Sequence, residues 1–230
     1  MSSPDPKGTT LAASWWSRRH NETVNNDWLP RVLEESRARG FLGPNAIEPH
    51  FTHSLGFALC WEEIEPAPPS SLLDLGSGGG LPGLFLLDRW HCRAVFTDSM
   101  VKRANFLEEV LEWDGAPDNG IVIAGRVEET ARIPELVESF DLVTARSFGP
   151  PAVTAECGAQ FLRVGGVMIV SEPPDDSDNA RWNSAKLGDL GLVAQGRVRH
   201  GAAYQVLVKT HSTPNEYPRG IGTPRKRPLF

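Results

Sequence analysis

Glycine is concentrated in one short run, Asp74 to Phe85, with the sequence DLGSGGGLPGLF. Five glycines fall between Asp74 and Gly83, where a short apolar run gives way to a helical pattern. Ligands of open α/β sheets bind at the carboxyl ends of the strands, so this turn is a candidate ligand site and not a linker. A P-loop is excluded, because Leu84 and Phe85 stand where that motif has its phosphate-binding Lys and its Ser or Thr.

A dinucleotide is one candidate ligand of the turn. Residues Gly78 to Gly83 match the pattern G-x-G-x-x-G, and Asp98 ends the next apolar run at the distance expected of a ribose-binding acid. We expect Asp98 to accept hydrogen bonds from ribose hydroxyl groups. The alternative is that Asp98 caps the following helix, a role that Ser99 could fill equally well.

A methyl donor is the other candidate, and the position of the first acid favours it. Asp74, Gly76, Gly78 and Gly80 form the pattern D-x-G-x-G-x-G of S-adenosylmethionine turns. A pyrophosphate binds bare amides at a helix N-terminus, whereas S-adenosylmethionine carries an ammonium and a sulfonium, which a carboxylate suits. Glycines let the backbone close on the methionine portion without Cβ clashes. We therefore expect these four residues to bind the cofactor.

The elements that position this turn alternate between short apolar runs and helical periodicity. Strands separated by helices predict right-handed crossovers and a mainly parallel sheet covered on both faces. Residues 191–210 differ, because two alternating runs flank His200-Gly201 and predict an antiparallel hairpin. The other expected elements are helices at Leu11–His20, Trp28–Arg39, Ile47–Glu62, 81–90, 101–113 and 151–162, and strands at 72–75, 93–98, 121–124, 140–145 and 166–171.

These elements predict an α/β architecture, the Rossmann-like fold of S-adenosylmethionine-dependent methyltransferases, with a mainly parallel seven-stranded sheet that ends in the hairpin. The proline-rich segment Glu65 to Ser71 divides the chain. We expect a helical N-terminal extension over residues 1–70, the Rossmann-like domain over residues 71–210 and a basic tail over residues 211–230.

Composition narrows the classes of protein. No apolar run reaches the length of about 20 residues that a membrane span needs, and the N-terminus lacks a signal core, so we expect a cytoplasmic protein. We also expect it to be a monomer. Cys60, Cys92 and Cys157 are too far apart for metal-ligand spacing and predict reduced thiols. His50 and His53 have no evident third ligand, so we expect no metal site.

The motifs as a set resemble one family. DLGSGGGLPG, FTDSMVKRANFLEEV, GRVEE, FDLVTARSF and the tail EYPRGIGTPRKRPL are similar to successive motifs of the RsmG (GidB) family over Arg39 to Phe230. The resemblance implies a methyltransferase that uses S-adenosylmethionine to methylate guanine N7 in 16S rRNA. Guanine N7 has a free lone pair at neutral pH, so this reaction requires alignment of the reacting atoms and no general base.

The resemblance also assigns roles to residues. It implies that Gly76 and Leu81 line the methionine and sulfonium region and that Val127 and Glu128 border the adenine. Arg146, at the end of the fourth expected strand, is then the catalytic candidate beside the cofactor and the base. The alternatives are a solvated or capping role for Glu128 and an ion pair of Arg146 with an acid such as Glu128.

Several residues are candidates for contact with RNA, the expected partner being 16S rRNA or the small ribosomal subunit. Phe148 could stack on a flipped-out base, although core packing is an equal alternative. Basic residues could contact phosphates, although a basic tail can also be a solvated segment. The basic candidates are Lys102, Arg103, Arg219, Arg225, Lys226 and Arg227.

The distribution of acids argues for a different substrate. The net charge is −6, and the family's Lys-Gly after the fifth strand is replaced by an acidic, proline-rich loop from Glu172 to Asp178. Acids on the substrate side should repel phosphate. A methyltransferase of another RNA or of a small molecule therefore stays as an alternative. A protein that binds the methyl donor or a dinucleotide without catalysis is the third alternative.

Overall fold

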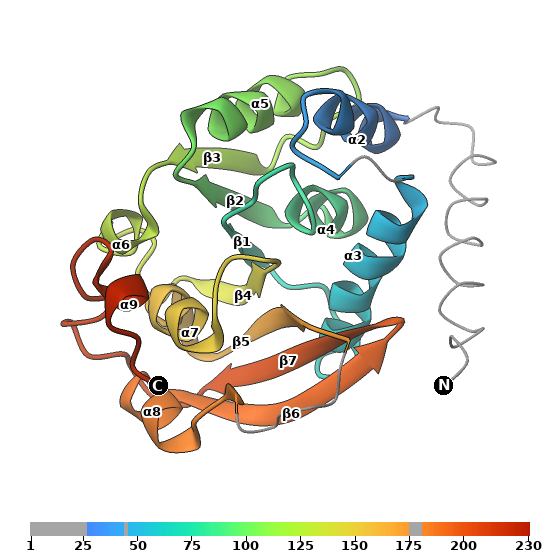
Figure 1. Cartoon of the computed structure of the whole chain (residues 1–230). Coiled ribbons are helices and arrows are strands. Elements are labelled where there is room, and N and C mark those ends of the chain that lie inside the picture. Colours follow the sequence, from blue (N-terminus) through green and yellow to red (C-terminus); the bar gives the residue numbers. More distant parts are fainter. Residues whose placement is uncertain (1–26, 44–45, 175–180) are drawn as a thin grey trace.

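A seven-stranded sheet forms the centre of the computed structural model, which describes residues 27–43, 46–174 and 181–230 (Figure 1). The strand order is β3-β2-β1-β4-β5-β7-β6, with β1 to β5 parallel and β7 antiparallel to both β5 and β6. This topology confirms the predicted Rossmann-like methyltransferase fold and its terminal hairpin. The strands are β1 (Ser71–Leu75), β2 (Arg93–Asp98), β3 (Gly120–Ala124), β4 (Phe140–Ala145), β5 (Leu162–Glu172), β6 (Leu192–His200) and β7 (Ala202–Lys209).

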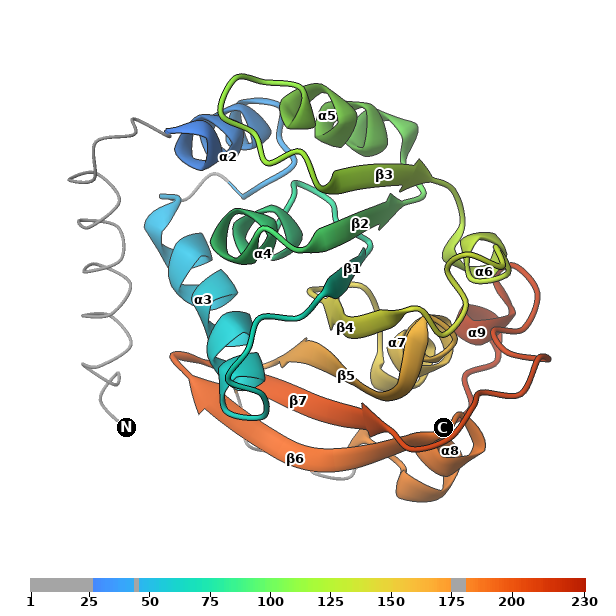
Figure 2. The ribbon, with the colours of Figure 1, turned by 180° about the vertical axis from the view of Figure 1, so that it is seen from behind.

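Helices cover both faces of the sheet (Figures 1 and 2). One apolar cluster joins α2, α3, α4 and α5 to one face, and a second joins α6, α7 and α8 to the other. All five residues of β1 are buried, as expected of a central parallel strand that both layers cover. The helices are α2 (Trp28–Ala38), α3 (Glu48–Glu62), α4 (Gly83–Trp90), α5 (Val101–Leu111), α6 (Val127–Thr130), α7 (Pro151–Ala159), α8 (Ser184–Asp189) and α9 (Thr223–Lys226).

The predicted bounds of β2 and β4 agree with the structure, and β5 differs most. It begins at Leu162, which pairs with Phe140 before a shift in register, so the helix expected over 151–162 ends at Ala159. Tertiary pairing has therefore converted the end of a helical pattern into strand. The helix expected over Leu11–His20 lies outside the described residues.

Helix α2 supports the glycine turn from behind. The indole Nε1 of Trp28 donates to the carbonyl of Val110 on α5 at 2.6 Å, which fixes α2 on the domain. The buried hydroxyl of Ser36 then donates to the carbonyl of Gly79 at 2.9 Å. An added Cβ on Gly79 would lie 2.5 Å from the Ser36 oxygen, so only glycine allows this approach. Helix α2 thus packs directly on the candidate ligand turn.

Candidate functional site

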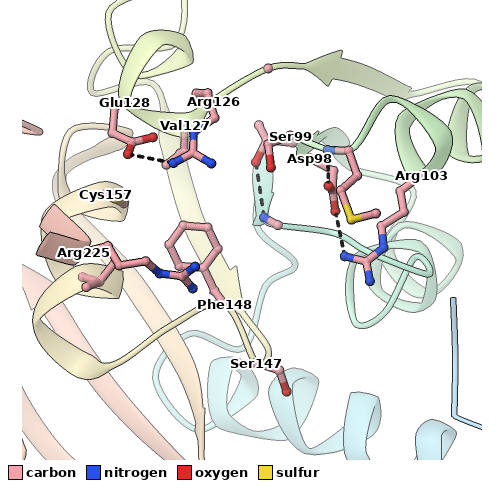
Figure 3. A pocket seen from close by; sticks show the side chains of 15 residues that line it. Asp98, Ser99, Arg103, Arg126, Val127, Glu128, Ser147, Phe148, Cys157 and Arg225 are labelled. Carbon is pink, nitrogen blue, oxygen red and sulfur yellow. Dashed lines mark hydrogen bonds and ion pairs between the residues drawn. The ribbon is translucent and has the colours of Figure 1, made fainter. Parts of the chain in front are cut away.

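A pocket of about 250 Å³ opens at the carboxyl ends of the parallel strands (Figure 3). Four loops contribute to it: those that follow β1, β2, β3 and β4. Ligand sites in doubly wound sheets lie at this edge. The lining residues are Gly76, Thr97, Asp98, Ser99, Met100, Arg103, Gly125, Arg126, Val127, Glu128, Ser147, Phe148, Val153, Cys157 and Arg225.

The glycine turn forms the floor of the pocket beside β1. Gly76, Gly78 and Gly80 have φ values of 68°, 56° and 99°, in the left-handed region that glycine adopts without strain. An added Cβ on Gly76 would lie 2.7 Å from the ring of Phe148. The absence of a side chain at Gly76 therefore makes room for the ring of Phe148. Gly78 and Gly80 shape the turn and, like the buried Leu81, do not line the pocket.

Asp98 holds the turn and the start of α5 together. Its Oδ2 accepts from the amide of Gly78 at 2.9 Å, and its Oδ1 accepts from the amide of Met100 at 2.8 Å. Arg103 lies 3.8 Å from Oδ2. Met100 occupies the N-cap position of α5, so the alternative in which Asp98 or Ser99 is the N-cap residue is wrong. Asp98 is only 6 % exposed and lines the pocket between the turn and α5.

Asp74 does not reach the pocket, which corrects the expected contact of its carboxylate with the cofactor. Its Oδ1 accepts from the hydroxyl of Thr144 at 2.7 Å, and its Oδ2 accepts from the amide of Gly83 at 3.2 Å. The side chain is 1 % exposed, and burial raises its pKa to about 6 despite these hydrogen bonds. The carboxylate therefore ties β1 to β4 and to the start of α4, behind the turn.

Glu128 forms the opposite wall of the pocket from the start of α6. Its carboxylate is 6 % exposed and accepts from the amide of Gly222 at 2.8 Å and from Arg126 at 3.5 Å. Burial alone would raise its pKa, but these contacts and its own amide hold the pKa below the ordinary value. The alternatives of a solvated Glu128 and of an ion pair between Glu128 and Arg146 are therefore wrong. Val127 lines the pocket beside it, as Figure 3 shows.

Arg146 directly follows β4, and its side chain faces helix α3. Its Nη2 donates to Nδ1 of His50 at 2.7 Å. Its Nη1 is buried and has no hydrogen-bond partner among the residues that the structure describes. Burial lowers its pKa, but an arginine in a protein remains charged at neutral pH. Ser147 and Phe148 line the pocket. Arg146 directly precedes them in the sequence but does not itself line the pocket.

The turn after β4 places an aromatic ring in the pocket. Ser147 has a φ of 57°, which is uncommon outside glycine and concentrated at functional sites. The turn directs Phe148 over Gly76 and into the pocket (Figure 3). Phe148 also packs against the apolar cluster of α7, so the packing alternative and a place in the pocket hold together.

The C-terminal segment, residues 211–230, packs on the domain and closes one side of the pocket. Glu156 on α7 is fully buried and accepts from the amide, the Nε and the Nη2 of Arg219 at 2.9, 2.8 and 2.6 Å. Arg219 therefore holds the segment against the domain, so the alternative of a solvated tail is wrong, and contact of Arg219 with RNA stays a prediction. Arg225 extends into the pocket toward Phe148 (Figure 3), and α9 lies beside α6 and α7 in both views.

The first acid of the expected acidic loop is neutralised. Glu172 pairs with Arg181 at 2.6 Å and accepts from the indole of Trp182 at 3.2 Å, and its side chain is 4 % exposed. It therefore presents little negative charge to an incoming phosphate. The acids Asp175, Asp176 and Asp178 lie outside the described residues.

Three functional candidates escaped sequence reasoning: Arg126, Cys157 and His50. Arg126 directly precedes Val127 in the motif GRVEE, so its place after the third strand was available as a signal. Nothing in the sequence indicates that Cys157 on α7 lines the pocket or that His50 bonds to Arg146. Lys102, Lys226 and Arg227 are exposed around the site, as an RNA contact requires.

The described part of the chain contains no group of three or more His, Cys, Asp or Glu side chains that could hold a metal ion. Cys60, Cys92 and Cys157 are buried free thiols. None of the helices that the structure describes is long and apolar enough to cross a membrane.

The chain is similar in sequence to known ribosomal RNA methyltransferases. Residues 40–194 match the family model described as GidB, rRNA small subunit methyltransferase G. A protein named ribosomal RNA small subunit methyltransferase G from Lactobacillus delbrueckii subsp. bulgaricus is 34 % identical over 92 % of this chain and 86 % of its own length. The protein of the same name from Roseiflexus castenholzii is 34 % identical over 79 % of this chain and 78 % of its own.

Solved structures share the fold at low sequence identity. Cofactor-bound Rv0187 from MTB superposes with a TM-score of 0.57 at 16 % identity, covering 92 % of this chain and all of its own. A geranyl diphosphate methyltransferase in complex with SAM gives a TM-score of 0.51 at 15 % identity, over 70 % of this chain and 86 % of its own. These similarities are evidence for the fold alone.

Proposed function

This chain belongs to the rRNA small subunit methyltransferase G (GidB) family, and we propose that it transfers a methyl group from S-adenosylmethionine to guanine N7 in 16S rRNA. The observation that carries the proposal is the single pocket that joins the glycine turn, Asp98 and the motif around Glu128. These motifs are far apart in the sequence and each matches the family. An rRNA substrate also places the enzyme in the cytoplasm.

The pocket fits S-adenosylmethionine better than a dinucleotide. Gly76 lines the pocket without a side chain, and the amide of Gly83 at the start of α4, where a pyrophosphate would bind, is already used by the buried carboxylate of Asp74. Asp98, at the end of β2, would accept from the ribose hydroxyls. Val127 and Glu128 would border the adenine, whose exocyclic amine can donate to the ionised Glu128. The cofactor supplies an electrophilic methyl group on a sulfonium when bound.

The residues of the chain contribute alignment and electrostatics. Because N7 attacks with its own lone pair, the site needs no base, and its task is to hold N7 in line with the methyl carbon and sulfur. Positive charge would pass from the sulfonium to the purine in this reaction, so fixed dipoles that follow this transfer would favour it. Arg146, next in sequence to the pocket residue Ser147, is the proposed catalytic residue. Phe148 is the proposed stacking surface for the flipped-out base.

Exposed basic residues around the pocket would contact RNA phosphates. Lys102 lies on α5, and Arg225, Lys226 and Arg227 lie on or next to α9, on the other side of the pocket. Arg103, also on α5, lines the pocket wall. Such phosphate contacts make affinity depend on salt and position the substrate without reading its sequence. We propose that the protein binds the small subunit or its rRNA as a monomer.

A labelled-methyl assay tests this proposal. Small ribosomal subunits and naked 16S rRNA, both from cells lacking the modification, are incubated with the enzyme and labelled S-adenosylmethionine. The product is then cleaved at N7-methylguanosine by borohydride and aniline. Transfer to one guanosine, lost in Asp98→Ala, is the expected result, and the preferred substrate distinguishes assembled subunit from naked RNA. Absence of label on rRNA, with label on small molecules, would favour the alternative substrate class.

Calorimetry tests the cofactor separately. S-adenosylmethionine should bind, and NAD should not. Tighter binding of NAD would overturn the choice of cofactor, and binding of S-adenosylmethionine without transfer to any RNA would indicate a protein that only binds the cofactor. Sedimentation of the protein at assay concentration tests the monomer.

A further inference from the structure

A partly buried arginine–histidine contact adjoins the pocket at the end of β4. Nη2 of Arg146 lies 2.7 Å from Nδ1 of His50, in the first turn of α3. The two residues are far apart in the sequence and belong to different layers of the fold. No carboxylate forms a hydrogen bond to Arg146 among the described residues, because the carboxylate of Asp74 is used by Thr144 and Gly83. His50 is therefore the hydrogen-bond partner that fixes this guanidinium.

The chemistry of arginine decides the protonation state of His50. A guanidinium has only donors, so Nδ1 of His50 must accept and the ring proton must sit on Nε2. Burial and the charge of Arg146 both lower the pKa of His50, which keeps the ring neutral at pH 7. Protonation of Nδ1 would replace an acceptor by a donor and place two cations in contact.

The contact leaves one donor of Arg146 unused. Its Nη1 is buried without a partner among the residues described here. Buried donors are nearly always paired with a protein or water acceptor, and Arg146 directly precedes the pocket residue Ser147, so a ligand that enters beside Ser147 is a candidate acceptor for Nη1. The edge of guanine that carries N7 has two acceptors, N7 and O6. N7 must keep its lone pair for the methyl group, so O6 is the acceptor that remains for Arg146.

We propose that His50 is a positioning residue for methyl transfer: its neutral Nδ1 holds Arg146 so that Nη1 can donate to O6 of the target guanine. The inference rests on the proposed function, because it takes guanine as the substrate. Adenine carries an amino group, a donor, in place of O6, and would leave Arg146 unpaired. The pair therefore also selects guanine over adenine.

The arrangement makes the reaction sensitive to acid through His50. The ionisable groups that face the pair are His53 from α3, Tyr204 from β7 and Asp74 from β1. Burial, Arg146 and His50 lower the pKa of His53 to about 4, and burial raises that of Tyr204. Burial raises the pKa of Asp74 to about 6, so Asp74 also changes its charge within the pH range of the assay. A variant of His50 that keeps Asp74 therefore distinguishes the effect of protonating His50 from the effect of protonating Asp74.

Two substitutions distinguish a positioning role from simple packing. In His50→Asn the amide oxygen can take the place of Nδ1 as acceptor, and the side chain does not titrate. In His50→Leu the volume is kept and the acceptor is lost. His53→Asn is the matched control, since His53 is a partly buried histidine one turn along α3 that forms no hydrogen bond to Arg146.

The test measures kcat and KM for methyl transfer to rRNA from about pH 5 to pH 8, together with cofactor affinity. His50→Leu should lower kcat by about tenfold or more, while the Kd for S-adenosylmethionine stays within about twofold. His50→Asn should recover most of kcat at pH 8 and lose the fall in kcat that the wild type shows at acid pH. His53→Asn should keep the wild-type profile.

Full activity of His50→Leu, or an acid limb that persists in His50→Asn, would overturn the proposal. If His50→Leu fails to fold, the pH profile of His50→Asn still decides. Nitrogen-15 NMR of the histidine rings gives a readout that needs no activity: the Nε2–H form is expected for His50, and an Nδ1–H form would refute the contact. Wild-type enzyme that is inactive on rRNA, with this tautomer present, would count against the proposed function and not against the pairing.

Discussion

Replacing Arg219 by Met should both destabilise the protein and weaken cofactor binding. The substitution keeps an unbranched side chain and removes the charge that faces Glu156. The carboxylate of Glu156 is fully buried, and it loses the bonds from Nε and Nη2 at 2.8 and 2.6 Å while keeping the backbone amide of residue 219. The bond from Nη2 to the carbonyl of Arg227 is also lost.

The size of the effect follows from burial. Removing one partner of a buried ion pair costs about 3–5 kcal/mol, because the remaining charge has no compensation. The side chain of Arg219 is 28 % exposed, so water can approach the carboxylate once the guanidinium is gone, and the lower limit of about 3 kcal/mol applies. For a chain of this size, that corresponds to a fall in Tm of roughly 6–12 °C.

The link to the cofactor comes from the position of Arg219 in the C-terminal segment. Gly222, three residues later, donates to Glu128, and Arg225 lines the pocket. When Arg219 no longer anchors the segment, both contacts loosen, and the Kd for S-adenosylmethionine should rise about fivefold to tenfold.

Urea unfolding and calorimetry measure the two effects. The double variant Arg219→Met/Glu156→Leu should regain at least half of the lost stability, since it removes the buried charge as well. Lys226→Met, which removes a charge from an exposed position of the same segment, is the control and should change stability by less than about 0.5 kcal/mol. Unchanged stability and cofactor affinity in Arg219→Met would refute the anchoring of the segment by this pair.

Three further predictions concern the turn and its neighbours. Asp98→Ala should raise the Kd for S-adenosylmethionine by at least about tenfold in calorimetry, since two backbone amides and the ribose lose their acceptor; unchanged affinity would remove Asp98 from the site. Gly83→Ala places a Cβ 2.6 Å from the ring of Phe96 and 2.7 Å from Oδ2 of Asp74, so thermal unfolding should report a loss of about 1–3 kcal/mol, and a neutral result would contradict this packing. Burial raises the pKa of Asp74 to about 6, so the folded state holds this proton more tightly than the unfolded state and stability falls as pH rises from about 4 to about 6. Asp74→Asn should remove up to about 3 kcal/mol of that pH dependence in urea unfolding, and an unaltered slope would show that Asp74 titrates normally.

Local sequence patterns are sufficient to predict the order of the elements and the location of the ligand edge. Apolar alternation and helical period are local properties, so β2 and β4 could be bounded from a few neighbouring residues. The glycine turn was equally local, because the left-handed backbone of Gly76, Gly78 and Gly80 is a property of those residues. Asp98 could be assigned to the pocket because it ends a strand at the ligand edge of the sheet.

The direction of the side chains, and the groups that they bind, depend on tertiary packing. Asp74 belongs to the cofactor motif, yet its carboxylate turns toward Thr144 and Gly83, because β1 lies between β2 and β4 and buries it. The partners of Arg146 and Glu128 are 96 and 94 residues away in the sequence. Such contacts depend on how the layers of the fold pack together, and they produce no periodic pattern in the sequence. For that reason the sequence predicts a basic tail, but only the tertiary structure shows that this tail closes one side of the pocket.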